Sequence, residues 1–320
     1  MSLFAGWLSL EAAPPPGAAA EIAARHVSAA TVETRGGRPV VAAHAAEPLP
    51  DGAVTPSLTG PNVRDKASVG AALARVLDAV GRPRRVGLVI PDPVAKVSIV
   101  RFEHVPPGAQ DLDRLIRWQV RKAAPFSIED AQVSHVAGLR APDGQEFIVT
   151  LAKREVVQEY ESLCAACGAH AGIVDLSTFN VINAALAAAF PGAADWLLVN
   201  VASDYTSIAV LRGTEMMFFR SRGADSEGTL ADLVHQTAMY YEDRLQGAGF
   251  TRVLLSGASV QASDVDHIRR SLQERLGRTV ETVDPSAAAA FADRITAAPA
   301  FLDRIAPLVG LLVRGREAAA

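Results

Sequence analysis

The stretch "LLVNVASDYTSIAVLRG", residues 197–213, holds the pattern that decides the fold. An apolar strand pattern runs into a short turn of small and polar residues, and a second strand pattern starts at Thr206. A chain of this form brings backbone N–H groups up to a bound phosphate. Phosphate-binding loops of this kind usually carry an aspartate and a glycine where this sequence has Asn200 and Ala202. The stretch therefore predicts a hairpin with the shape of a phosphate-binding loop, in which the usual aspartate and glycine are replaced.

The same plan occurs near the N-terminus, 177 to 179 residues earlier in the chain. Strand patterns and a tight turn at "RGGR" predict three short strands there, at 20–23, 27–34 and 39–44. Glu21 aligns with Asn200, and Ala23 aligns with Ala202. Duplicated halves imply two related domains that face each other across a cleft.

The remaining segments predict an α/β chain with an insertion. Apolar residues at spacings of three and four predict helices over 66–80 and 229–246. A buried strand ends in "SGA" at 256–258, and residues 301–314 predict an apolar helix. The expected parts are a flexible N-terminus at 1–16, a first domain at 17–84 and 169–192, an α+β insertion in ββαββα order at 85–168, and a second domain at 193–320 whose C-terminal helix packs back onto the body.

Composition excludes several classes of protein. A net charge of −4 over 320 residues lacks the excess of basic residues that is typical of nucleic-acid-binding proteins. No apolar run approaches the roughly 18 residues that a membrane helix needs, so we expect no transmembrane segment.

The apolar stretch at 3–10 has two interpretations, a loose terminus or a contact with a membrane surface. Cys164 and Cys167 lack a second pair, which favours two half-buried thiols on a helix over a metal or redox site.

The order of these elements resembles the order found in the actin-like ATPase superfamily. Within that superfamily, the sequence is most similar to the type IV pilus assembly protein PilM family. The most specific similarity lies in the insertion, in "LIRWQVRKAAPFSIEDAQVSH" at 115–135. It continues in "LAKREVVQEYESLCAACGAHAGIVDLSTFNVINAAL" at 151–186 and "RVLLSGAS" at 252–259, and covers about 17–316. The resemblance implies two actin-like (RNase H-like) domains, with the inserted α+β subdomain, called 1C, in the first domain, 1A.

The resemblance also implies a function. Members of the family are cytoplasmic and lie peripheral to the bacterial inner membrane. They bind the cytoplasmic N-terminal peptide of a PilN-like membrane protein in a groove between 1A and 1C. For this chain, the helix at 110–124 and the strands at 95–103 and 27–34 are expected to flank that groove. A pilus motor ATPase, a platform protein and a second copy of the chain are further expected partners.

ATP fills the cleft between the domains in better-preserved members of the family. The corresponding positions here are Ala23, Arg25, His26, Ser28, Asn200, Ala202, Ser203, Asp204, Thr206, Ser256 and Gly257. Methyl groups in the turns disfavour positive φ and push a phosphate away from the backbone amides. The neutral Asn200 cannot offset a magnesium ion, and the family's lysine is missing at Ser28. We therefore expect a degenerate cleft that binds ATP and magnesium weakly or not at all, with no catalytic residue and no metal ligand.

Two other functions stay open on the sequence. The first is an active actin-like ATPase or kinase, for which Asp204 and Asp175 are the carboxylates placed near the expected loops. The second is the cytoplasmic actin-like domain of a type II secretion platform protein, which normally continues into a membrane helix.

Overall fold

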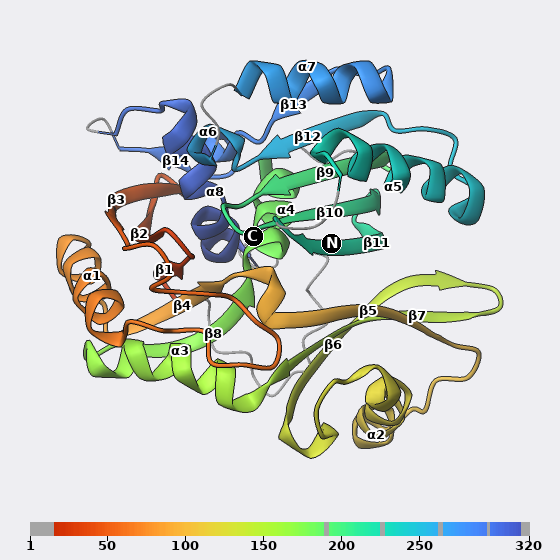
Figure 1. Cartoon of the computed structure of the whole chain (residues 1–320), viewed down its shortest axis with the longest axis horizontal. Coiled ribbons are helices and arrows are strands. Elements are labelled where there is room, and N and C mark those ends of the chain that lie inside the picture. Colours follow the sequence, from red (N-terminus) through yellow and green to blue (C-terminus); the bar gives the residue numbers. More distant parts are fainter. Residues whose placement is uncertain (1–15, 189–191, 225–227, 262–264, 293–294, 315–320) are drawn as a thin grey trace.

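The computed structural model describes residues 16–188, 192–224, 228–261, 265–292 and 295–314. Figure 1 shows two lobes, each built on a β-sheet, and a third small sheet that projects beside them. The expected flexible segment at 1–16 lies outside these residues except for Pro16. Among the described residues, no helix combines the length and the apolar character that crossing a membrane requires.

The first lobe carries a six-stranded sheet in the order β14-β3-β2-β1-β4-β8. Its strands are β1 (Ala18–Ile22), β2 (His26–Arg35), β3 (Arg38–Pro48), β4 (Arg85–Ile90), β8 (His170–Leu176) and β14 (Ala290–Phe291). Strands β1 to β3 form an antiparallel meander, whereas β4 and β8 continue the sheet in parallel from β1. Helix α1 (Lys66–Ala79) and helix α3 (Arg154–Ala166) pack together on this lobe.

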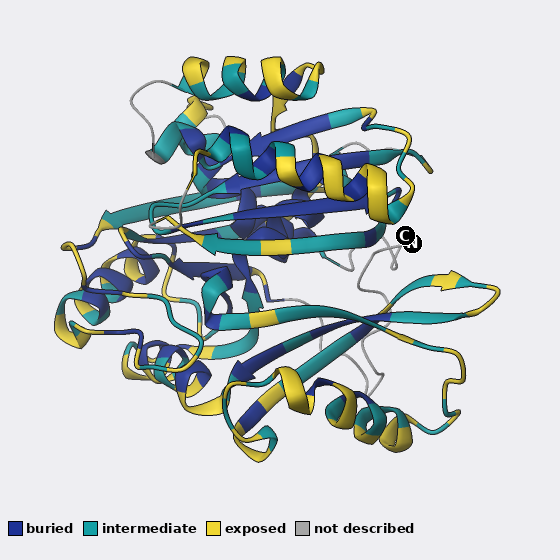
Figure 2. Ribbon diagram, turned by 45° about the vertical axis from the view of Figure 1, so that its right-hand side comes forward, coloured by how far each residue is buried: buried dark blue, intermediate teal, exposed yellow. Residues whose placement is uncertain are grey.

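The second lobe repeats the plan with the order β11-β10-β9-β12-β13. Its strands are β9 (Asp195–Val201), β10 (Tyr205–Arg212), β11 (Glu215–Gly223), β12 (Arg252–Ser256) and β13 (Val280–Thr282). Its helices are α5 (Leu230–Leu245), α6 (Ala258–Gln261) and α7 (Val265–Leu276). Figure 2 shows the central strands of this sheet buried, with exposed residues on the outer faces of the helices.

Equivalent hydrogen bonds confirm the duplication. The Ala23 N–H donates to the His26 carbonyl at 2.9 Å, and the Ala202 N–H donates to the Tyr205 carbonyl at 2.9 Å. The strand registers agree as well, since Glu21 pairs with Ser28 and Asn200 pairs with Ser207. A constant offset of 179 residues relates both pairs, so the alignment of the two turns made on the sequence is correct.

The elements between residues 85 and 166 follow the expected ββαββα order, but the first strand and the last helix pack with the first lobe. The insertion itself contains β5 (Ala95–Phe102), α2 (Ala109–Val120), β6 (Ala131–Ala141) and β7 (Gly144–Lys153), with the sheet order β5-β7-β6. Strand β4 belongs to the first lobe instead, because its run of buried apolar residues suits a central strand covered on both faces. Helix α3 likewise buries its apolar side chains in the core of the first lobe, including Tyr160 and Cys164.

Helix α8 (Pro299–Val313) packs back onto the first lobe, as expected for the C-terminal helix. It lies against α4 (Ser177–Ala188) and against strands β1, β2 and β4, between the two sheets (Figure 1). The approach to α4 is close, because a Cβ atom added to Gly310 would lie 1.7 Å from the Asn180 carbonyl oxygen. Leu308, Leu311 and Leu312 are fully buried in this layer.

Candidate functional site

Two hairpin turns, one from each lobe, meet at a small chamber between the lobes. The β1–β2 turn brings Ala23 and His26, and the β9–β10 turn brings residues 200–205. The start of α4, the β12–α6 turn and α8 complete the wall. The chamber has a volume of about 50 Å³ and shares residues with an outer groove of about 660 Å³, which is bounded by β3 and α7.

Most residues expected in the nucleotide cleft do lie together. Seven line the chamber: Ala23, His26, Asn200, Ala202, Ser203, Asp204 and Gly257. Arg25 lines the outer groove, together with His26. Ser28, Thr206 and Ser256 line neither space. Ser28 and Thr206 stand past the turns, inside strands β2 and β10, and the Ser256 side chain is buried at the end of β12.

The turns keep ordinary backbone geometry where a phosphate loop would use glycine. Among the described residues, positive φ outside glycine occurs at Arg82 and Gln246, so neither Ala23 nor Ala202 adopts it. Gly257 is different, because its φ is +80° and an added Cβ atom would lie 2.0 Å from the Val201 carbonyl oxygen. A glycine is therefore required at the end of β12 for close packing of the two chain segments.

A buried polar network joins the lobes next to the chamber. Asp92, in the short 3-10 helix Asp92–Val94 that follows β4, accepts hydrogen bonds from the Thr178 N–H at 3.1 Å and from the Thr178 hydroxyl. It also accepts from the Ser207 hydroxyl in the other lobe. Asn200, also in the other lobe, donates to the Thr178 Oγ1 at 2.8 Å. All four side chains are buried, so the network links the lobes through side chains shielded from solvent.

The network explains why an amide suits position 200. The Thr178 hydroxyl carries one proton, and it donates that proton to Asp92. The oxygen of the hydroxyl is then free to accept, and the Asn200 amide supplies the matching donor. An aspartate at this position would offer a second acceptor for a single proton, next to an existing carboxylate.

Burial dominates the electrostatics of these carboxyl groups. Desolvation raises the pKa of Asp92 to about 6, against the hydrogen bonds from Ser207 and Thr178, which lower it. Desolvation also raises the pKa of Asp204, which lines the chamber. Asp175, the other carboxylate expected near the loops, does not line the chamber and pairs instead with Arg314, just after the end of α8, at 2.5 Å. Burial raises its pKa as well.

The charges around the chamber fit a magnesium triphosphate poorly. Glu21, Asp204 and Asp303 all line the chamber. Glu21 accepts a hydrogen bond from the Ser177 hydroxyl at 3.0 Å, and Asp303 accepts from the Ser259 N–H at 2.7 Å. Within the described ranges, no group of three or more histidine, cysteine, aspartate or glutamate side chains is placed to hold a metal ion. The outer groove has room for a nucleotide, but the chamber where its phosphates would enter is small and acidic.

The cations near the cleft have limited capacity for an anion. Arg25 already pairs with Asp51, and His26 lies 3.5 Å from a Glu21 oxygen. Arg304 lines both spaces, and its buried Nε has no hydrogen-bond partner among the described residues. A single guanidinium next to three carboxylates does not replace the lysine and glycine amides of a phosphate cradle.

Sequence reasoning missed four residues that join the lobes, Asp92, Thr178, Ser207 and Asp303, and two that line the chamber, Ser177 and Arg304. Asp92 stands between two prolines, Pro91 and Pro93. Its position between prolines was the one local signal of a fixed backbone. Its partners lie 86 and 115 residues away in the chain, so local patterns give no indication of the contacts.

The comparison with protein families decides the identity. The family described as type IV pilus assembly protein PilM matches residues 20–243. The chain belongs to the PilM family. A solved structure described as a PilM–PilN type IV pilus biogenesis complex is similar over 94% of this chain and 98% of its own, with 17% identity and a TM-score of 0.79.

A second solved structure is similar in fold. It is a protein of unknown function from Bacteroides thetaiotaomicron, described as having an actin-like ATPase fold. It covers 87% of this chain and 94% of its own, with 11% identity and a TM-score of 0.50. The chain therefore has the actin-like fold expected from its sequence.

Proposed function

We propose that this protein is a scaffold of type IV pilus assembly at the cytoplasmic face of the bacterial inner membrane. Its partner is the cytoplasmic N-terminal peptide of a PilN-like membrane protein. Membership of the PilM family supports the role. The similarity in fold to a PilM–PilN complex along nearly the whole chain supports the partner and is the observation that carries the proposal.

The proposed peptide site is the junction between the first lobe and the insertion. Helix α3 contacts α1 and β8 on one side and β6 and β7 on the other. The Arg154 guanidinium at the start of α3 donates to the Ala131 carbonyl at the start of β6, at 3.1 Å. Strand β2, expected beside the site at 27–34, lies between β1 and β3. The proposed site adds α3 to the expected flanking elements, β2, β5 and α2.

Titration calorimetry with a PilN-like N-terminal peptide tests the partner. We expect binding to the full chain, and weaker binding by Arg154→Ala, because loss of the link to Ala131 lets the insertion shift relative to α3. Arg269→Ala on α7, far from the junction, is the matched control and should bind like the wild type. Absence of binding to every PilN-like peptide encoded beside this chain would contradict the proposal.

The proposed scaffold works without ATP hydrolysis. The acidic chamber, the turn alanines and the internal Asp92 network support this part of the proposal. A working site at a ligand concentration of 100 Kd would stabilise the fold by about 2.7 kcal/mol. We expect millimolar MgATP to shift the melting temperature no more than the same ionic strength of salt does. The active-enzyme alternative requires ATP turnover above background that Asp204→Ala abolishes, and such a result would replace this proposal.

A further inference from the structure

The insertion is joined to the first lobe by two connections. One is helix α3, and the other is the short 3-10 helix Asp92–Val94, which follows β4 and leads directly into β5. We call this 3-10 helix the connector. Asp92 and Val94 are both fully buried, and prolines on each side of Asp92, Pro91 and Pro93, restrict the backbone. The position of the connector therefore determines where the insertion sheet begins relative to the first lobe.

The second lobe contacts both the connector and the insertion. Ser207 of β10 is fully buried and donates a hydrogen bond to the Asp92 carboxylate. Strand β11 packs against the connector and also against β5 and β6 of the insertion. Phe219 of β11 packs against the same apolar core that includes Val136 of β6 and Ile148 of β7. The insertion is therefore held by both lobes, and the connector takes part in both sets of contacts.

The proposed peptide site lies between the first lobe and the insertion, the two parts that the connector joins. Figure 1 shows β5 running from the first lobe to the insertion, below β11 of the second lobe. A peptide that contacts both parts binds more weakly when they first have to be ordered relative to each other, because that ordering costs free energy.

We propose that Ser207, a residue of the second lobe, is a positioning residue for the peptide site. Its hydrogen bond to Asp92 fixes the connector, and the connector fixes the insertion beside α3. Ser207 itself lies on β10 and acts through Asp92 without touching the peptide. This inference rests on the proposed function, because the peptide site is part of that proposal.

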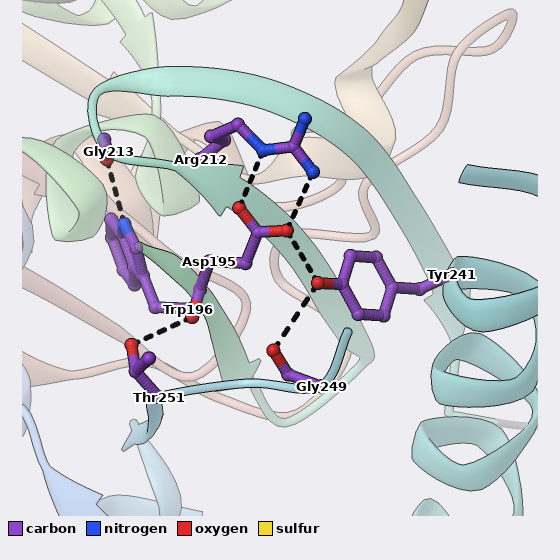
Figure 3. Close-up of polar contacts among 7 residues, drawn as sticks. All are labelled: Asp195, Trp196, Arg212, Gly213, Tyr241, Gly249 and Thr251. Carbon is purple, nitrogen blue, oxygen red and sulfur yellow. Dashed lines mark hydrogen bonds and ion pairs between the residues drawn. The ribbon is translucent and has the colours of Figure 1, made fainter. Parts of the chain in front are cut away.

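A comparable network at Asp195 lies within the second lobe alone. Figure 3 shows the Asp195 carboxylate accepting two hydrogen bonds from Arg212 and one from the Tyr241 hydroxyl, the last at 2.5 Å. These residues come from β9, β10 and α5 of this lobe. Removing the Tyr241 hydroxyl therefore deletes the same kind of bond as removing the Ser207 hydroxyl does, without affecting the connector. Tyr241→Phe is the matched control for Ser207→Ala.

Titration calorimetry with a PilN-like N-terminal peptide at pH 7 tests the role of Ser207. We expect Ser207→Ala to weaken binding at least about fivefold, which corresponds to about 1 kcal/mol from one hydrogen bond. Tyr241→Phe should bind like the wild type, although it also loses a hydrogen bond to a carboxylate. Asp92→Asn is the conservative variant and should bind within about twofold of the wild type, because its amide can still bond to the Ser207 hydroxyl.

Hydrogen exchange followed by mass spectrometry gives a readout that needs no peptide. In Ser207→Ala, the amides of β5 and β6 should exchange about five times faster than in the wild type. Tyr241→Phe should leave the exchange of these strands unchanged. Since Ser207 belongs to another lobe, a defect confined to its own surroundings would not reach the insertion.

The two measurements separate this inference from the proposed function. If no PilN-like peptide binds to the wild type, the proposed function is wrong, and the exchange of β5 and β6 decides whether Ser207 positions the insertion. Unchanged exchange of these strands in Ser207→Ala overturns the inference in either case. Unchanged or tighter peptide binding by Ser207→Ala also overturns it, and so does an equal loss of binding in Ser207→Ala and Tyr241→Phe.

Discussion

Replacing Asp92 with asparagine tests whether a buried carboxylate joins the two lobes. Asparagine has nearly the same shape and stays neutral at every pH used. Three hydrogen bonds from Thr178 and Ser207 converge on the Asp92 carboxylate, which is fully buried. Both hydroxyls can turn to accept from the new amide. The rearranged hydrogen bonds should cost about 0.5–1.5 kcal/mol near pH 4, where the carboxyl group is protonated in the folded protein.

The pH dependence of the free energy of unfolding reports the protonation of Asp92. Burial raises its pKa from 3.8 to about 6, so the folded protein binds this proton more tightly than the unfolded chain does. Stability therefore falls as the pH rises from about 4 to about 6, by about 3 kcal/mol from this group. Asp175 and Asp204 also have raised pKa values and are present in both proteins. Asp175 contributes to the raised pKa of Asp92, so its interaction with Asp92 is part of the measured difference.

The assay is urea unfolding of both proteins, followed by circular dichroism at several pH values between about 4 and 7. The free energy of unfolding of Asp92→Asn relative to the wild type should rise by about 3 kcal/mol across that range. Asp266→Asn on α7 is the matched control, since this side chain is 79% exposed, and its difference from the wild type should stay nearly constant. A constant difference for Asp92→Asn as well would show that Asp92 does not titrate there, and would refute the argument from burial.

Two further substitutions and one labelling experiment test the packing. Tyr241→Phe removes the hydrogen bond to Asp195 and should lower the free energy of unfolding by about 1–2 kcal/mol; an unchanged urea midpoint would contradict the role of this contact. Gly310→Ala should destabilise by more than about 3 kcal/mol or prevent folding, because the new methyl group meets the α4 backbone. The matched helical control, Gly70→Ala, has open space and should be neutral or stabilising by up to about 1 kcal/mol. Burial raises the pKa of the Cys164 thiol to about 12, so its labelling by iodoacetamide at pH 8 should be far slower than that of a free thiol; rapid labelling in the folded state would contradict this.

Local sequence determined the parts of the fold whose partners are adjacent in the chain. The two meanders could be predicted because period-2 patterns and short turns specify hairpins on their own. The equivalence of the two meanders could be predicted because their turns align at one offset, the 179 residues that separate Ala23 from Ala202. The α8 helix could be predicted from a long apolar run.

Tertiary structure alone decided which sheet each buried strand joined. The run at 85–90 has the pattern of a buried strand, but that pattern does not say which neighbours supply its hydrogen bonds. In the fold it pairs with β1 and β8, and the insertion begins after it. The cysteine-bearing helix α3 packs on the first lobe, which its sequence did not predict. An amphipathic pattern predicts that one face of a helix is buried, but it does not predict which element covers that face.

The chemistry of the cleft divides in the same way. The sequence by itself determined which side chains stand at the two turns, Ala23, Asn200 and Ala202, at positions where the resemblance implies a phosphate cradle. Only the tertiary structure decided which side chains these residues contact. Asp92, Thr178 and Ser207 come from three distant segments, and their hydrogen bonds exist because folding brings buried polar groups together where water cannot satisfy them.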